Sequence, residues 1–88
     1  MMTSEERQQN AEHQEWTRRG HEARRQRETL RITQDELHEC TGFSITTIRR
    51  FEHGQCIRKR KVMEHAYMTG LECIALRREA EANLKKHH

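Results

Sequence analysis

The stretch TQDELHECTGFSITTIRRFEHG, residues 33–54, decides the fold. Thr33 is a favourable helix N-cap, and Glu36, three residues later, completes a capping box. Gly42 stands where a chain leaving a helix needs a positive φ, and Ser44 is a second N-cap. The helix that follows has an apolar face at spacing i, i+3 and i+6, formed by Ile45, Ile48 and Phe51. The stretch therefore predicts two short helices joined by a tight turn, which are the dimensions of a helix-turn-helix.

This stretch resembles the helix-turn-helix of the lambda-repressor/Cro-like (XRE) family. The matching positions, without a gap, are Thr33, Gln34, Asp35, Glu36, Leu37, Gly42, Phe43, Ser44, Ile48, Phe51, Glu52 and Gly54. The first helix of the family is matched upstream by Gly20, Ala23, Arg24 and Arg27. The resemblance covers about half to two-thirds of the chain, roughly one domain core. It implies a prokaryotic or phage DNA-binding protein that regulates transcription.

Composition limits the chain to one small domain. Of its 88 residues, 35% are charged and only 32% hydrophobic, and it has no Pro. No run alternates as a half-buried strand would, no apolar window approaches membrane-spanning length, and the N-terminus is not a signal peptide. We expect an all-α fold, no membrane partner and a cytoplasmic location.

The formal net charge of the chain is +3, and this positive excess lies wholly in residues 31–61, which carry seven basic and four acidic residues. Such a local excess is typical of a protein that binds phosphate backbones.

We expect five helices, preceded by a polar arm over residues 1–15 that is either helical or disordered. The first core helix spans residues 16–30, where Trp16, Gly20, Ala23, Arg27 and Leu30 recur at helical spacing. After the helix-turn-helix, a fourth helix has Val62, Met63, Ala66 and Tyr67 on its inward face and ends at Gly70. A fifth helix extends from residue 71 to about residue 86. Residues 16–88 form the DNA-binding domain.

Arg27 lies on the inward face of the first core helix, where a charge needs a partner. The family resemblance implies that this partner is Glu52, so we expect a partly buried ion pair between the first and third helices. Family members usually have Gly or a short polar residue in place of Arg31, where the backbone is left-handed. Either the turn differs in this chain, or Arg31 is present because it reaches a phosphate.

The predicted DNA-binding residues fall into three groups. On the second helix of the motif, which would lie in the major groove, the exposed candidates are Ser44, Ile45, Thr46, Thr47, Arg49 and Arg50. Gln34 begins the first helix of the motif, and the resemblance implies that it contacts phosphate. The third group is a basic clamp formed by Arg58, Lys59, Arg60 and Lys61. Ile45 and Thr46 can pack on a thymine methyl group, and Arg49 or Arg50 can fork onto guanine, with Arg50 favoured because it matches a base-contacting position of the family.

One recognition helix covers few base pairs, so we expect a homodimer on a palindromic operator, built on the fifth helix with or without the N-terminal arm. The fifth helix has two apolar faces, of which one can pack inward and the other against a second copy. The first face has Leu71, Ile74, Ala75 and Arg78, and the second has Cys73, Leu76, Ala80 and Leu84. The other function considered is an antitoxin-like protein, in which a DNA-binding domain also binds a small protein partner through a polar tail.

A structural zinc site is disfavoured because the candidate ligands His53, Cys56, His65 and Cys73 do not occur in the closely spaced pairs that such sites use. The sequence has no phosphate-binding loop and no nucleophile elbow, so neither an enzyme nor a cofactor is expected.

Overall fold

The computed structural model describes residues 3–86, and this part of the chain is all-helical, with four helices and no strand. The helices are α1 (Ser4–Thr29), α2 (Gln34–Thr41), α3 (Ile45–Glu52) and α4 (Arg60–Lys86). The all-α prediction is confirmed, but the prediction of five helices is wrong. The expected fourth and fifth helices are one continuous helix, α4.

Gly70 does not end a helix, because its role is in packing. It is buried near the middle of α4, and a Cβ at this position would lie 2.8 Å from a methyl group of Thr41 and 2.9 Å from one of Leu37. Both of these residues belong to α2, so the missing side chain lets α2 approach α4 closely. A glycine in a helix interior costs about 1 kcal/mol, which tertiary contacts of this kind override.

The helix predicted for residues 16–30 begins twelve residues earlier, at Ser4. Residues 4–15, predicted as a polar arm, are therefore the first turns of α1. The described side chains of residues 4–14 are exposed, so this half of α1 extends beyond the core. Trp16, at the point where α1 meets the core, is half-buried and packs against it. Two guanidinium groups, those of Arg19 and Arg60, lie 5.2 and 5.5 Å from the centroid of the Trp16 ring.

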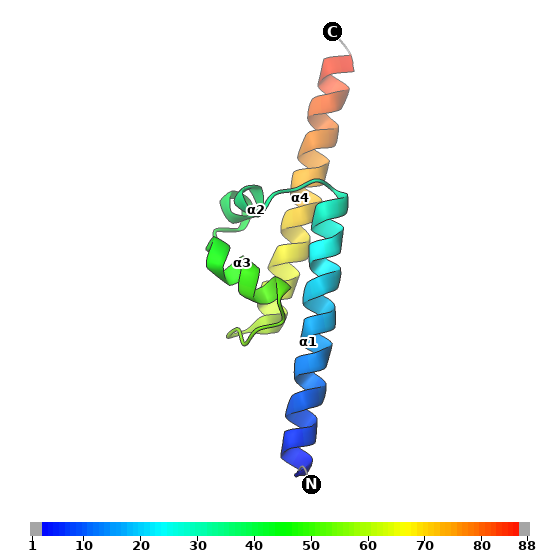
Figure 1. The fold of residues 1–88 in the computed structure, drawn as a ribbon. Coiled ribbons are helices and arrows are strands. Elements are labelled where there is room, and N and C mark those ends of the chain that lie inside the picture. Colours follow the sequence, from blue (N-terminus) through cyan, green and yellow to red (C-terminus); the bar gives the residue numbers. More distant parts are fainter. Residues whose placement is uncertain (1–2, 87–88) are drawn as a thin grey trace.

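α1 and α4 lie side by side and run in the same direction, while α2 and α3 pack against one side of the pair (Figure 1). Contacts between the two long helices show this parallel register: Arg19 pairs with Glu64, and Arg78 donates hydrogen bonds to the carbonyls of Leu30 and Arg31. The helices are staggered, so the start of α1 and the end of α4 project from opposite ends of the molecule. The resulting shape is elongated, with extents of 67 × 20 × 16 Å.

The core lies where all four helices meet. Its buried hydrophobic residues are Ala23, Ile32, Leu37, Ile48, Phe51, Met63, Tyr67, Leu71 and Ile74. The rings of Phe51 and Tyr67 join α3 to α4, with centroids 5.1 Å apart. Val62, predicted to face inward, is 60% exposed instead. Ile32, in the turn before α2, is buried at 2% exposure although the sequence patterns assign it no core role.

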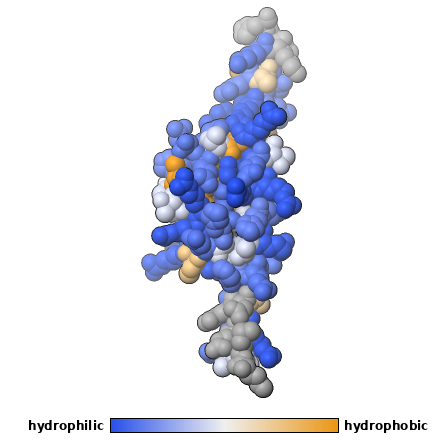
Figure 2. All heavy atoms as spheres, in the orientation of Figure 1, coloured by the Kyte–Doolittle hydropathy of each residue, from blue (hydrophilic) through white to orange (hydrophobic). Residues whose placement is uncertain are grey.

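The face of the molecule in Figure 2 is mainly hydrophilic, with small separate hydrophobic areas. The second apolar face of α4 is not covered within the chain, since Leu76 and Leu84 are each 65% exposed. None of the helices over residues 3–86 has a stretch long and apolar enough to cross a lipid bilayer.

Candidate nucleic-acid interface

The turn between α2 and α3 is fixed by residues close to it in sequence. The capping box at the start of α2 is confirmed: Thr33 Oγ1 accepts a hydrogen bond from the amide of Glu36, whose carboxylate accepts one from the amide of Thr33. Gly42 ends the helix in the left-handed conformation (φ +81°), and its amide donates to the carbonyl of His38 at 2.8 Å. Ser44 caps α3 by accepting a hydrogen bond from the amide of Thr47. These caps satisfy backbone groups at the ends of α2 and at the start of α3, and so fix where the two helices begin and where α2 ends.

α3 has a buried face and an exposed face. Ile48, Phe51 and Glu52 are buried against the rest of the molecule. The exposed side chains at the start and middle of the helix are Ser44, Thr46, Arg49 and Arg50, while Ile45 and Thr47 are half-buried. The structure therefore leaves all six predicted residues exposed or half-buried, so none of them is lost to the core. They offer hydroxyl groups, two guanidinium groups and a partly exposed apolar side chain.

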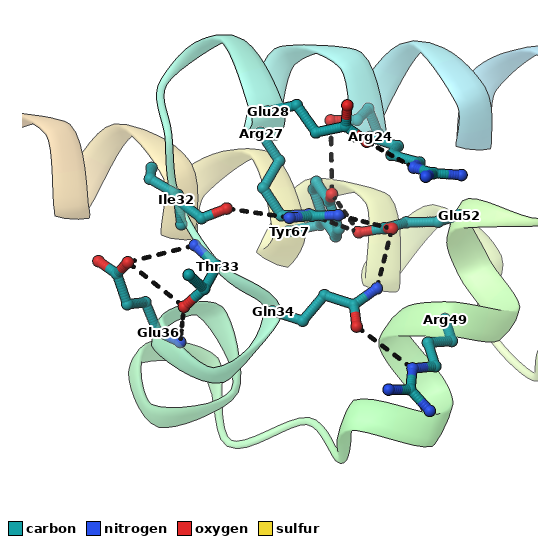
Figure 3. Close-up of polar contacts among 11 residues, drawn as sticks. Arg24, Arg27, Glu28, Ile32, Thr33, Gln34, Glu36, Arg49, Glu52 and Tyr67 are labelled. Carbon is teal, nitrogen blue, oxygen red and sulfur yellow. Dashed lines mark hydrogen bonds and ion pairs between the residues drawn. The ribbon is translucent and has the colours of Figure 1, made fainter.

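The ion pair expected between Arg27 and Glu52 is present and joins α1 to the last residue of α3 (Figure 3). Arg27 Nε donates to Glu52 Oε2 at 2.8 Å, and Nη2 donates to Oε1 at 3.1 Å. The side chains are 11% and 2% exposed, respectively. The remaining Arg27 nitrogen, Nη1, donates to the carbonyl of Ile32 at 2.9 Å. The pair is thus bidentate, buried and further satisfied by the backbone, which is the favourable geometry for a buried charge.

Two further residues complete the environment of the Glu52 carboxylate. Tyr67 Oη donates to Oε2 at 2.7 Å, and Gln34 Nε2 donates to Oε1 at 3.1 Å (Figure 3). Gln34 Oε1 in turn accepts a hydrogen bond of 3.2 Å from Arg49 Nε. The structure therefore connects a buried charge to the exposed face of α3 through Gln34. Sequence patterns placed Tyr67 on an inward face and Gln34 at a helix start, but gave neither of them Glu52 as a partner.

This environment shifts the pKa values of the groups in it. Burial by itself raises the pKa of the Glu52 carboxyl, but hydrogen bonds from Arg27, Tyr67 and Gln34 outweigh burial and bring the pKa below its ordinary value. Burial and the hydrogen bond to Glu52 both raise the pKa of Tyr67, so that its hydroxyl stays protonated and remains a donor. The carboxylate is thus the ionised partner of three donor residues, Arg27, Tyr67 and Gln34, at neutral pH.

The lowered pKa of Glu52 predicts acid-sensitive stability. Because the folded-state pKa lies below the unfolded value of about 4.3, the stabilisation by Glu52 is complete above about pH 5 and is lost as the pH falls through the folded-state pKa. The difference in unfolding free energy between the wild type and Glu52→Gln should therefore shrink at low pH. Urea unfolding of both proteins at pH 7, 5 and 3 measures this. A difference that stays constant over this range would contradict it.

An open groove of about 720 Å³ runs between the end of α1, the start of α2 and the outer face of α3. Gln34, Ile45 and Arg49, all predicted from the sequence, line it. So do Arg24, which no site prediction includes, and Arg31. Arg31 has a left-handed backbone (φ +56°), as the family resemblance implies for this turn, although the residue is not Gly.

The four residues of the predicted basic clamp have different surroundings. Arg58 and Lys59 are exposed in the loop before α4. Arg60 lies over the ring of Trp16, and Lys61 lines a separate groove between α1 and α4 together with Arg18 and Glu22. The loop therefore supplies two exposed cations, Arg58 and Lys59, while Arg60 contributes to the packing of α1 against α4. Sequence spacing alone cannot separate these roles, because the positions are consecutive.

Among residues 3–86, no three side chains of His, Cys, Asp or Glu converge as a metal site. Cys40, Cys56 and Cys73 are free thiols.

Comparisons of the chain with protein-family models, with curated proteins and with solved structures find no match.

Proposed function

We propose that the chain is a sequence-specific double-stranded DNA-binding regulator of transcription that acts as a repressor. The observation that carries the proposal is the capped α2–turn–α3 unit, whose second helix presents Thr46, Arg49 and Arg50 to solvent. A helix held in this way enters the major groove with its leading turn at the base edges, while the preceding helix crosses the backbone. The resemblance of residues 33–54 to the lambda-repressor/Cro-like family supports the same function.

The surroundings of α3 provide contacts for the phosphate backbone. The start of α2, next to Gln34, offers unpaired amide groups and the positive end of a helix dipole. Arg31, at the groove, and Arg58 and Lys59, in the loop before α4, are exposed cations on either side of the motif. Phosphate contacts of this type position a protein on the duplex without reading its sequence.

We further propose that the protein binds a palindromic operator as a homodimer. Half-sites read by two copies of α3 would lie about one helical turn, ~34 Å, apart on the DNA. The uncovered face of α4, with Leu76 and Leu84 each 65% exposed, is an apolar surface available for the second copy. A closed twofold pair uses the same surface on both copies.

Selection of bound sequences from random duplex DNA tests this function, and a palindromic result is expected. In a salt-titrated mobility-shift assay, Arg58→Ala and Lys59→Ala should weaken binding to the selected and random duplexes about equally. Each should also reduce the slope of log K against log salt by roughly 0.9, because each removes one phosphate contact. Val62→Ala, an exposed position without charge, is the control. Failure to bind any duplex at low salt, or a strict monomer on the selected duplex by sedimentation, would contradict the corresponding part of the proposal.

An antitoxin-like function is the second candidate, and the shape of the molecule is what favours it. The first turns of α1 and the last turns of α4 project from the core as helices with exposed side chains. Such helices can bind a small protein partner while α3 remains free for DNA. Co-purification of one small protein with the full chain, lost when residues 1–15 are removed, would support this function over that of a simple repressor.

A further inference from the structure

Arg49 and Arg50 are both exposed on α3, but they differ in their side-chain contacts. Arg49 is held by Gln34 (Figure 3). Arg49 Nε donates a hydrogen bond of 3.2 Å to Gln34 Oε1. None of the side chains that the structure describes pairs with Arg50. Since an unrestrained arginine loses rotamer freedom when it binds, the two residues differ in what binding costs them.

The orientation of the Gln34 amide follows from the buried charge behind it. An ionised carboxylate only accepts hydrogen bonds, so Gln34 must direct Nε2 towards Glu52 Oε1, 3.1 Å away. Its carbonyl oxygen therefore faces α3, where it accepts from Arg49. Glu52 is itself fixed by Arg27 and Tyr67. The position of the Arg49 guanidinium is thus determined through a continuous chain of hydrogen bonds that begins in the core.

This arrangement leaves one edge of the Arg49 guanidinium unoccupied. The group is planar and has five N–H bonds, and the bond to Gln34 uses the one on Nε. The two terminal nitrogens, Nη1 and Nη2, have no partner among the described residues. They form a fork that matches two acceptors side by side, such as guanine O6 and N7 or two oxygens of one phosphate.

We infer that Gln34 and Glu52 are positioning residues that hold Arg49 as the side chain that forks onto a pair of DNA acceptors, either the guanine edge or one phosphate. The inference rests on the proposed DNA-binding function and names the residue that carries its main polar contact. It also gives Gln34 a role other than the phosphate contact implied by the family resemblance, and it favours Arg49 over Arg50.

Positioning can be measured in the free protein, independently of DNA. In ¹⁵N–¹H correlation spectra, the Arg49 Nε–H should exchange with water about fivefold more slowly than the Arg50 Nε–H, the size expected for one partly exposed hydrogen bond. Gln34→Met keeps the length of the side chain but removes its polar atoms, so it should abolish this difference. The Arg27 Nε–H should remain protected in that variant. Equal exchange of Arg49 and Arg50 in the wild type would overturn the inference, whether or not the protein binds DNA.

Binding to the selected duplex measures the consequence. Arg49→Lys retains the charge but not the fork, so affinity for this duplex should fall about tenfold. Arg50→Lys, the matched control, should cause a smaller loss. Gln34→Met should weaken binding in the wild type and have almost no further effect in Arg49→Lys, as expected for coupled residues. Unchanged affinity of the Arg49→Lys protein would overturn the inference. So would a loss of binding free energy in Gln34→Met that adds fully to the loss in Arg49→Lys.

Modified duplexes separate the two sources of the acceptor pair. If the partner is guanine, replacing one guanine by 7-deazaguanine should lower the affinity of the wild type about tenfold. The same replacement should not lower the affinity of Arg49→Lys further. If it is a phosphate, a methylphosphonate at one linkage should do so instead, and Arg49→Lys should lose affinity for random DNA as well. If Arg49→Lys loses affinity but neither modification weakens binding of the wild type to a similar extent, the proposed two-acceptor contact of Arg49 is wrong.

Discussion

Arg27→Met and Glu52→Gln should each lower the free energy of unfolding by about 3 kcal/mol, since each leaves the other partner as an uncompensated buried charge. The two side chains are only 11% and 2% exposed, and they share two hydrogen bonds of 2.8 and 3.1 Å. For a domain of this size, each kcal/mol corresponds to roughly 4–8 °C in Tm. Urea and thermal unfolding at pH 7 measure the effect, which should exceed that of any exposed ion pair in the molecule.

Arg24→Met is the matched control for this prediction. Arg24 also lies on α1 and pairs with Glu28, but its side chain and that of Glu28 are 51% and 54% exposed. Exposed pairs of this kind contribute less than about 1 kcal/mol. The double variant Arg27→Met/Glu52→Gln should lose less than the sum of the single losses, because no unpaired charge remains. If Arg27→Met destabilises the protein no more than Arg24→Met, the ion pair does not anchor α3 to α1.

The two short helices α2 and α3 and the turn between them could be predicted from sequence because the capping residues satisfy groups within one turn of themselves. Thr33 and Glu36 cap each other, Gly42 accepts the left-handed conformation that ends α2, and Ser44 caps the next helix. Such signals require no knowledge of the tertiary structure. The all-α class follows in the same way, because apolar residues recur at helical spacing from Trp16 onwards and no run alternates as a strand would.

The contacts between helices were less predictable. Gly70 has the sequence signature of a helix end, yet it lies within α4 because Leu37 and Thr41 approach it from α2. The Arg27–Glu52 pair spans 25 residues and was expected only from the family resemblance. The link from Glu52 through Gln34 to Arg49 joins α2 to α3 and has no local signature at all. In each case the deciding partner lies on another helix, where sequence periodicity carries no information.

Gly20→Ala should destabilise the protein by about 1–3 kcal/mol, although alanine is favoured over glycine in a helix interior by about 1 kcal/mol. Gly20 lies within α1, where an added Cβ would be 2.3 Å from the carbonyl oxygen of Phe51 and 2.8 Å from that of Glu52. These are backbone atoms at the end of α3, so they cannot rotate away as a side chain can. The added methyl group must therefore separate α1 from α3 and strain the ion pair that joins them.

Gly70→Ala is the control that isolates this effect. It is also a buried glycine in a helix interior, but its added Cβ would meet the terminal methyl groups of Thr41 and Leu37 at 2.8 and 2.9 Å. Side-chain methyl groups can shift at lower cost than a backbone, so Gly70→Ala should be the milder change in urea and thermal unfolding at pH 7. A Gly20→Ala protein as stable as the wild type would mean that the backbones of α1 and α3 do not approach each other at this point. The close contact that places the end of α3 over Arg27 would then be absent, and the hydrogen-bonded chain from Glu52 to Arg49 would lose its support.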